Sequence, residues 1–406
     1  MPSLSLPKPQ LDLGSLKSVS MPSFKAGSKK GELLVGLDIQ PGYIAAVQAH
    51  VNGSVRVERA AGMDLPGDVV REGEVVDGDA LTEALRELFR SSRLDKRVRI
   101  GVANQRTVLR MLELPPIADR KELEAAVRFQ AEDQVPMPLE NATLDFHPLD
   151  LIETAAGPRQ RVVVVAAQRE MIQRLLSAAR NAGLQPEGVD LSAFALIRSL
   201  HTPGEEEAEP RVLYLNVAGL TNMAIAEGTV CRFTRVIGGG LESIAGSAAA
   251  AHNMPLSESR NLLGAVDLTP RREPEPEPVT EIVDELDDAE GSQTPTAHET
   301  PSKALYAQPS GPDLRPTLES GLREIAGAVR NSLEFHRLQD GGGDVSAVVL
   351  SGPALRIAGF AQALERELGV PVRARSVELL SGDSVGSAPP ECLAVAAGLA
   401  VEEAPR

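Results

Sequence analysis

The chain contains no tryptophan, and its aromatic content is only 3%. Stacking on the bases of a single-stranded nucleic acid is therefore poorly supplied. The formal net charge of −16 over 406 residues also argues against binding to phosphate backbones, which requires a basic surface. Hydrophobic residues nevertheless make up 42% of the chain, which is long enough for two or more cores. We therefore expect globular lobes with cores of alanine, valine, leucine and isoleucine.

Cysteines and long apolar runs are scarce as well. Cys231 and Cys392 form neither a CxxC nor a Cys/His pattern, so a disulfide framework and a zinc site are not expected. No run approaches the roughly 20 apolar residues that cross a bilayer. Residues 1–30 lack the continuous apolar core of a signal peptide. These absences predict a cytoplasmic protein with free thiols.

Charge is spread unevenly along the chain. Residues 273–299 contain ten acidic side chains and no lysine or arginine, whereas residues 1–30 carry five lysines and one aspartate. We expect residues 1–30 to form a disordered basic tail, and attraction to anionic lipid or to a partner is the functional alternative. Residues 270–312 are rich in proline and glutamate, and offer too little apolar surface to offset the entropy of ordering. We expect them to be a disordered acidic insertion.

The order of predicted elements repeats weakly on either side of a break at residues 203–207. Turn-forming pairs, Pro41-Gly42 and Asn52-Gly53, separate the first set of strands. Short runs rich in valine, isoleucine and alanine predict strands at 33–39, 43–51, 54–60, 97–103, 108–114, 142–149, 161–167, 184–190, 211–217, 222–227, 230–237, 345–350 and 370–374. Helical spacing of apolar residues predicts helices at 78–91, 120–134, 169–182, 193–200, 241–252, 256–263, 316–338, 359–368 and 390–401. Both halves open with a meander of three strands, which predicts two α/β lobes.

Three loops carry the chemical interpretation. The first, residues 36–42, has Asp38 near the end of a strand; the second spans 215–221, and the third spans 350–354. Two glycine-containing hairpins can clamp a polyphosphate through backbone N–H groups, with carboxylates holding Mg²⁺ through water. Each loop alone is a weak signal for nucleotide binding. The order of the three loops and their separation in the chain are the stronger signal.

Together the loops resemble those of the sugar kinase, Hsp70 and actin superfamily. More narrowly, the chain from Leu34 to Ala400, apart from the acidic insertion, resembles the PilM family of type IV pilus assembly proteins, which is related to the division protein FtsA. The stretches that carry the resemblance are 65–66, 73–77, 112–115, 124–132, 135–139, 144–146, 233–235, 238–240, 325–326, 330–335 and 398–400.

The resemblance implies an α/β, actin-like (ribonuclease H-like) ATPase fold. It consists of two lobes with a small subdomain inserted in the first lobe. We expect the core of the first lobe at 31–78 and 151–204, the subdomain at 79–150, and the second lobe at 205–404. The family also implies a scaffold that binds the N-terminal cytoplasmic peptide of a PilN-like inner-membrane protein, and so lies at the inner face of the cytoplasmic membrane. Self-association is left open.

The resemblance also places ATP and Mg²⁺ between the lobes. It implies a metal-directed carboxylate at Asp38. The implied nucleotide-binding residues are Asp38, Asn216, Gly219, Thr221, Gly239, Gly240, Glu258 and Gly352.

Several positions depart from the family pattern. Pro41 removes a backbone donor from the first loop, and Ala45 stands where a lysine is usual. Asn216 replaces an aspartate, and its neutral carbonyl is a poorer partner for a divalent cation. Pro353 replaces a glycine of the third loop. We therefore predict a degenerate cleft with no catalytic residue, and both residual ATP binding and complete loss of the nucleotide stay open.

Two other functions remain as alternatives. A small-molecule kinase of the same fold would need a pair of Mg²⁺ carboxylates and a catalytic base, and Asn216 and the missing lysine oppose it. A filament-forming protein like FtsA would carry a C-terminal amphipathic helix, whereas this sequence ends in Glu402-Glu403-Ala404-Pro405-Arg406.

Overall fold

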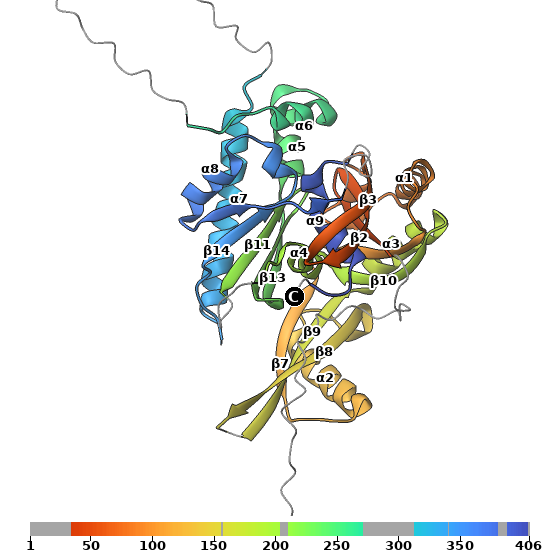
Figure 1. Cartoon of the computed structure of the whole chain (residues 1–406), viewed down its shortest axis with the longest axis vertical. Helices are drawn as coiled ribbons and strands as arrows, with labels where there is room; N and C mark the ends of the chain where they lie inside the picture. The colour runs from red at the N-terminus through yellow and green to blue at the C-terminus, as the bar shows by residue number, and fades with distance from the viewer. Residues whose placement is uncertain are drawn as a thin grey trace, which may run out of the picture.

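The computed structural model describes residues 34–155, 157–203, 210–270, 312–339, 341–380 and 388–404. The expected basic tail and nearly all of the expected acidic insertion lie outside these ranges. The described chain forms two α/β lobes, and a small third sheet extends below them in Figure 1. Across these ranges, no helix is both long and apolar enough to span a membrane.

The first lobe is built on a six-stranded sheet with the order β10-β6-β1-β2-β3-β16. Its strands are β1 (Val35–Gln40), β2 (Tyr43–Asn52), β3 (Ser54–Asp64), β6 (Arg97–Val102), β10 (Gln185–Leu191) and β16 (Glu378–Leu379). The predicted meander of β1 to β3 is confirmed, as are the turns at Gly42 and Gly53, which both have positive φ. One face of the sheet packs on α1 (Gly78–Ser91) and α3 (Arg169–Asn181).

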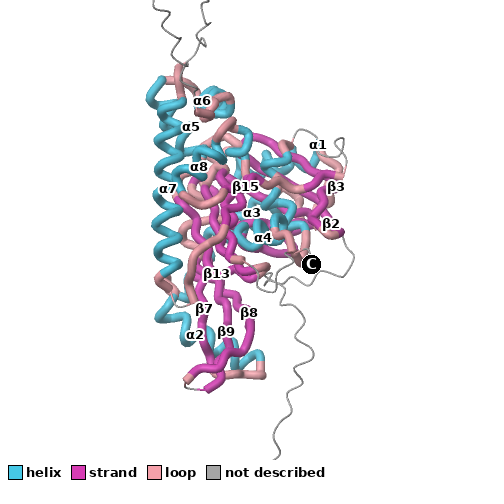
Figure 2. Tube along the Cα trace, turned by 60° about the vertical axis from the view of Figure 1, so that its left-hand side comes forward, coloured by secondary structure: helices cyan, strands magenta, loops and turns pink. Residues whose placement is uncertain are grey.

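The second lobe is a five-stranded sheet with the order β13-β12-β11-β14-β15. Its strands are β11 (Arg211–Val217), β12 (Thr221–Glu227), β13 (Val230–Ile237), β14 (Ala347–Ser351) and β15 (Val372–Ala374). Its helices are α5 (Leu241–His252), α6 (Leu256–Gly264), α7 (Arg315–Arg337) and α8 (Phe360–Leu368). Figure 2 shows α7 running along the outer side of this lobe, and its apolar stripe, which includes Leu318, Leu322 and Ile325, is buried.

Two helices fill the space between the sheets: α4 (Ser192–Leu200) and α9 (Ala394–Ala400). α9 packs against α4, β1 and β2, although we expected residues 205–404 to belong to the second lobe. Glycine permits this close packing, because a Cβ on Gly36 would lie 1.8 Å from the carbonyl oxygen of Ala396. β16 also joins the first-lobe sheet, beside β3. The described residues 388–404 therefore pack mainly with the first lobe, across the boundary that we expect at residue 205.

The small sheet has the order β7-β9-β8 and packs against one helix. Its elements are β7 (Val108–Leu114), α2 (Arg120–Gln134), β8 (Ala142–Thr154) and β9 (Gly157–Gln168). Relative to the subdomain expected at 79–150, α1 and β6 pack in the first lobe, whereas β9 pairs with both β7 and β8. The strands β8 and β9 are also longer than predicted, and β9 is the central strand of the small sheet.

A few local details differ from the prediction. The short hairpin of β4 (Val70–Arg71) and β5 (Glu74–Val75) was not predicted, and the helix expected at 390–401 divides into a 3₁₀ turn (Pro390–Cys392) followed by α9.

The residues that flank the expected acidic insertion lie close to each other. Arg315 donates to the carbonyl oxygens of Asp267 (2.9 Å) and Thr269 (3.2 Å).

Candidate functional site

The first loop holds a buried carboxyl group with one bonded side-chain partner. Asp38 lies on the face of β1 opposite Leu37 and Ile39, and it is only 6% exposed. Gln40 Nε2 donates to Asp38 Oδ2 at 2.9 Å. Burial raises the pKa of Asp38 to about 7, because the amide hydrogen bond only partly offsets desolvation. Asp38 is therefore not a permanently ionised carboxylate at neutral pH.

The second and third loops meet at the ends of β11 and β14, which pair in parallel. The Ser351 hydroxyl donates to Asn216 Oδ1 at 3.0 Å, and both side chains are buried. Gly352 has a φ of 98°, and a Cβ there would lie 2.8 Å from Asn216 Oδ1. The side-chain oxygen of Asn216 is thus engaged inside its own lobe.

The loops of the two lobes touch each other. A Cβ on Gly219 would lie 2.1 Å from the carbonyl oxygen of Pro41, so only glycine fits there. A Cβ on Gly240 would lie 2.6 Å from the carbonyl oxygen of Ala218. The backbones of the two hairpins are therefore in contact at this point.

An ion pair of the second lobe covers the first hairpin. Arg260 Nε on α6 donates to Glu242 Oε2 on α5 at 2.8 Å, and Arg260 Nη1 donates to the carbonyl oxygen of Leu65 at 3.1 Å. A Cβ on Gly42 would lie 2.8 Å from Glu242 Oε2. Arg260 was not among the site residues expected from the sequence. No local spacing could have revealed this contact, because Leu65 and Arg260 are far apart in the chain.

The structure brings some of the expected site residues together and leaves others apart. Asn216, Gly219, Gly240 and Gly352 lie around the end of β11. Glu258 is exposed on α6, and Gly239 has only Ser243 within reach of a built Cβ. Thr221 is fully buried, and its hydroxyl has no hydrogen-bond partner among the described residues.

The residues present do not fit the Mg-ATP arrangement that the resemblance implies. Asp38 is the one carboxylate of the three loops, its pKa is raised, and the oxygen of Asn216 is engaged by Ser351. Mg²⁺ requires a near-octahedral set of oxygen ligands, usually with one or two carboxylates. In the ranges that the structure covers, no group of three His, Cys, Asp or Glu side chains is arranged to hold a metal ion.

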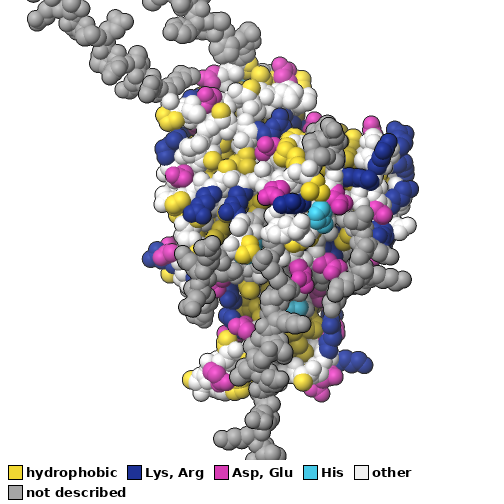
Figure 3. Space-filling view, viewed as in Figure 1, with side chains coloured by type: hydrophobic (Ala, Val, Ile, Leu, Met, Phe, Trp, Pro, Cys, Tyr) yellow, Lys and Arg dark blue, Asp and Glu magenta, His cyan; other side chains and the backbone are white. Residues whose placement is uncertain are grey.

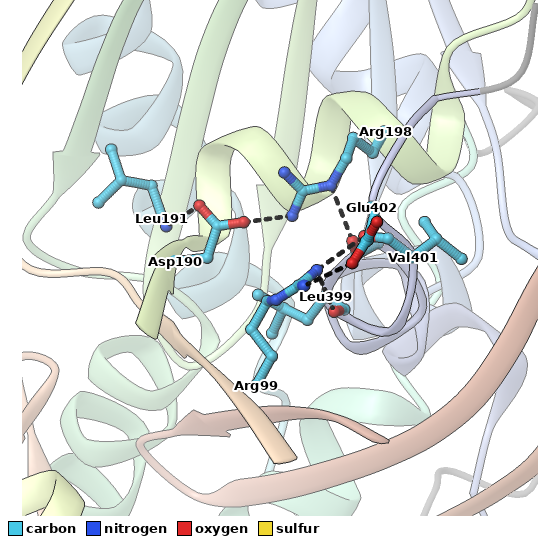
Figure 4. Close-up of polar contacts among 8 residues, drawn as sticks. Arg99, Asp190, Leu191, Arg198, Leu399, Val401 and Glu402 are labelled. Atoms are coloured by element: carbon cyan, nitrogen blue, oxygen red, sulfur yellow. Dashed lines mark hydrogen bonds and ion pairs between the residues drawn. The ribbon is translucent and has the colours of Figure 1, made fainter. Parts of the chain in front are cut away.

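Below the loops, two buried arginines hold the C-terminal end of α9 (Figure 4). Arg198 forms an ion pair with Asp190, both side chains being fully buried, and its Nε donates to the carbonyl oxygen of Gly398 at 2.9 Å. Arg99 Nη1 donates to the carbonyl oxygens of Leu399 (3.2 Å) and Val401 (3.0 Å). These guanidinium groups satisfy carbonyl groups that a helix end leaves unpaired. Desolvation lowers the pKa of Arg99.

Comparison with known proteins identifies the family. A sequence model described as "Type IV pilus assembly protein PilM" matches residues 36–236. Over these residues the chain belongs to the PilM family. The chain is also similar to a solved structure, the "PilM-PilN type IV pilus biogenesis complex", at 24% identity and a TM-score of 0.69. That match covers 91% of this chain and 98% of the PilM chain, and it confirms the expected actin-like fold.

Two further solved structures are less similar to this chain. EutJ, an ethanolamine utilization protein from Carboxydothermus hydrogenoformans, is 12% identical, with a TM-score of 0.49 and coverage of 90% of this chain and 88% of EutJ. MreB5 of Spiroplasma citri bound to ADP is 11% identical, with a TM-score of 0.44 and coverage of 91% and 95%.

Proposed function

We propose that this PilM-family chain is a scaffold of the pilus assembly platform that binds the N-terminal cytoplasmic peptide of a PilN-like membrane protein. The observation that carries the proposal is the open edge of the small sheet. In the described part of the chain, β8 pairs with β9 alone, so its other edge offers unpaired backbone groups. An extended peptide can add to such an edge through main-chain hydrogen bonds. A solved complex of PilM with PilN on the same fold supports this choice of partner.

The edge of β8 suits a peptide better than the edge of β7. β8 begins beside the first lobe, where Arg169 Nη2 donates to the carbonyl oxygen of Ala142 at 3.0 Å. Leu151 on β8 is 58% exposed and would be covered by a paired segment. Leu109 on β7 instead packs against the core that includes α4 and residues of the second lobe. The proposed peptide site therefore runs along the open edge of β8.

The cleft between the lobes supports a scaffold rather than an enzyme. Phosphoryl transfer depends on Mg²⁺ and on fixed donors that stabilise charge in the transition state. Pro41 contacts Gly219, Arg260 bonds to the carbonyl oxygen of Leu65, and Asp38 has no second carboxylate beside it in the three loops. We infer a degenerate cleft that binds ATP weakly at most and does not turn it over. The protein would then reach the inner face of the membrane through its partner.

The test is a titration of the full-length protein with a synthetic peptide that copies the N-terminal cytoplasmic segment of the PilN-like protein from the same operon. Saturable binding is expected, with slowed backbone hydrogen exchange in β8 and unchanged exchange in β7. A scrambled peptide is the ligand control.

Two matched variants sharpen the test. Leu151→Glu should weaken binding, whereas Phe335→Glu on α7, where the side chain is similarly exposed at 56%, should not. Absence of binding, or protection confined to the second lobe, would overturn the proposal.

A further inference from the structure

One face of the first lobe gathers exposed cations at the end of α1, in the loop after it and at the end of α3. We call it the basic face and define it by Arg90, Arg93, Lys96 and Arg180, all of which are exposed. The basic residues next to them in sequence are neutralised, since Arg86 pairs with Glu83 and Arg97 pairs with Asp95. None of the four defining side chains lies in an ion pair within the described ranges. Dark blue atoms cluster over α1 and α3 at the right-hand edge of Figure 3.

Hydrogen bonds bring these segments together. Arg86 Nη2 on α1 donates to the carbonyl oxygen of Asn181, the residue after Arg180, at 2.8 Å. The backbone N–H of Gln185 donates to the carbonyl oxygen of Lys96 at 2.8 Å. Arg59 reaches the same face from β3, because its Nη1 donates to the carbonyl oxygen of Arg93 at 3.1 Å. The four cations therefore belong to one continuous surface.

The N-terminal part of the chain joins the fold at this same edge. β1 and β6 pair in parallel with Val35 beside Val98, so Leu34 lies next to Arg97 and close to Lys96. Residues 1–30, with five lysines and one aspartate, are connected to the fold there. The sequence that precedes Leu34 therefore also carries net positive charge.

Helix stability explains the positions of only two of these four cations. Arg90 and Arg180 are last-turn residues, where a cation favourably meets the negative end of the helix dipole. Arg93 and Lys96 follow α1 and have no such role. The face is also basic on a chain whose net charge is −16, so an anionic surface would attract this side and repel the rest.

We propose that the basic face docks on an anionic phospholipid membrane. Lysine and arginine side chains near an anionic leaflet each add to the attraction, and the attraction decreases as salt is added. The choice of a lipid surface over a nucleic acid rests on the proposed function, which puts the chain beside a membrane protein. Docking would hold the first lobe and the open edge of β8 close to the membrane, where the partner's peptide begins.

The test is sedimentation of the purified full-length protein with vesicles of phosphatidylcholine alone and of phosphatidylcholine with phosphatidylglycerol. No partner peptide is present, so the result is independent of the proposed function. Binding only to the anionic vesicles is expected, and it should be lost at high salt. The triple variant R90Q/R93Q/K96Q should bind anionic vesicles at least about tenfold more weakly. Thermal unfolding of the variants checks that they are folded.

The control is R323Q/R366Q/R373Q, which removes the same charge from exposed arginines of the second lobe and should bind like the wild type. Removal of residues 1–30 should weaken binding without abolishing it. Three results would overturn the proposal: no binding to anionic vesicles at low salt, an equal loss in the control variant, or binding that depends on residues 1–30 and not on the basic face.

Discussion

The space between the two lobes has a deep part, around Asp190, Arg198 and α9, and a shallow part, around Asp38 and Asn222. The two parts differ in whether a buried charge has an oppositely charged partner. In the deep part, Arg198 meets both Asp190 and a carbonyl group of α9. In the shallow part, Asp38 is buried with only the Gln40 amide bonded to it, and both amide atoms of Asn222 lack a partner among the described residues. The ion pair and the carbonyl contacts of the deep part stabilise the packing of α9. The shallow part holds buried polar groups with few partners, and none of them lies in an ion pair among the described residues.

The largest effect should follow from breaking the deep part. Arg198→Met leaves Asp190 as an uncompensated buried charge and frees the carbonyl group of Gly398. The free energy of unfolding should fall by about 3–5 kcal/mol, measured by urea denaturation. Arg128→Met removes one partner of an exposed pair with Glu124 and should cost no more than about 1 kcal/mol.

A double variant separates the ion pair from packing. Arg198→Met combined with Asp190→Leu removes both charges and should recover most of the lost stability. If the double variant were as unstable as the single one, the carbonyl contact and packing, and not the charge, would explain the loss.

The second effect is a pH dependence that belongs to the shallow part. The folded-state pKa of Asp38 is about 7 and its ordinary value is 3.8, so the folded state holds the proton more tightly. Stability from this group is therefore fully present below about pH 4 and is lost as the pH rises to about 7. The upper limit of that loss is about 4 kcal/mol.

Asp38→Asn should remove this loss, because the amide stays neutral at all these pH values. The variant should be more stable than the wild type at pH 8 and similar to it at pH 4, measured by urea denaturation across the range. Parallel pH profiles for the two proteins would show that Asp38 is ionised in the fold at neutral pH.

A third, smaller effect tests the contact between the hairpins. A methyl group on Gly219 would collide with the carbonyl oxygen of Pro41, so Gly219→Ala should cost about 1–3 kcal/mol. Gly246 is the matched control, since it lies within α5 with open space around its Cβ position. Gly246→Ala should be neutral or stabilising by up to about 1 kcal/mol. Thermal unfolding distinguishes the two, and equal stability would mean that the hairpins separate readily.

The smallest effect is expected outside both parts. Arg315 holds the residues on the two sides of the acidic insertion together, so a short linker can replace residues 271–311. The free energy of unfolding should change by less than about 1 kcal/mol. A large loss of stability would show that the insertion packs on the fold.

Most elements of this fold could be predicted from sequence because their signals are local. The boundaries of α1 and α2 agree with their apolar spacing, and Asp77 and Asp119 accept hydrogen bonds from the first turns of these helices. The domain boundaries could not be predicted in the same way. The places of β9 and α9 depend on pairing and packing with residues distant in sequence.

The candidate site shows the same limit. The three loops were found from their glycines, whereas the contacts that decide their chemistry are long-range, as between Pro41 and Gly219. The sequence did contain a signal for one of the buried arginines, Arg198, and the sequence analysis missed it. Arg198 is the only charged residue of a helix whose residues are all buried, and a charge in such a run needs a buried partner.

The central claim is that the shallow part does not support ATP turnover. The most direct measurement is phosphate release from Mg-ATP by the full-length protein, with and without the partner peptide, compared with Asp38→Ala under the same conditions. The account predicts the same background rate for both proteins in both conditions. Turnover near the roughly 1–100 s⁻¹ of ordinary kinases, abolished by Asp38→Ala, would contradict it.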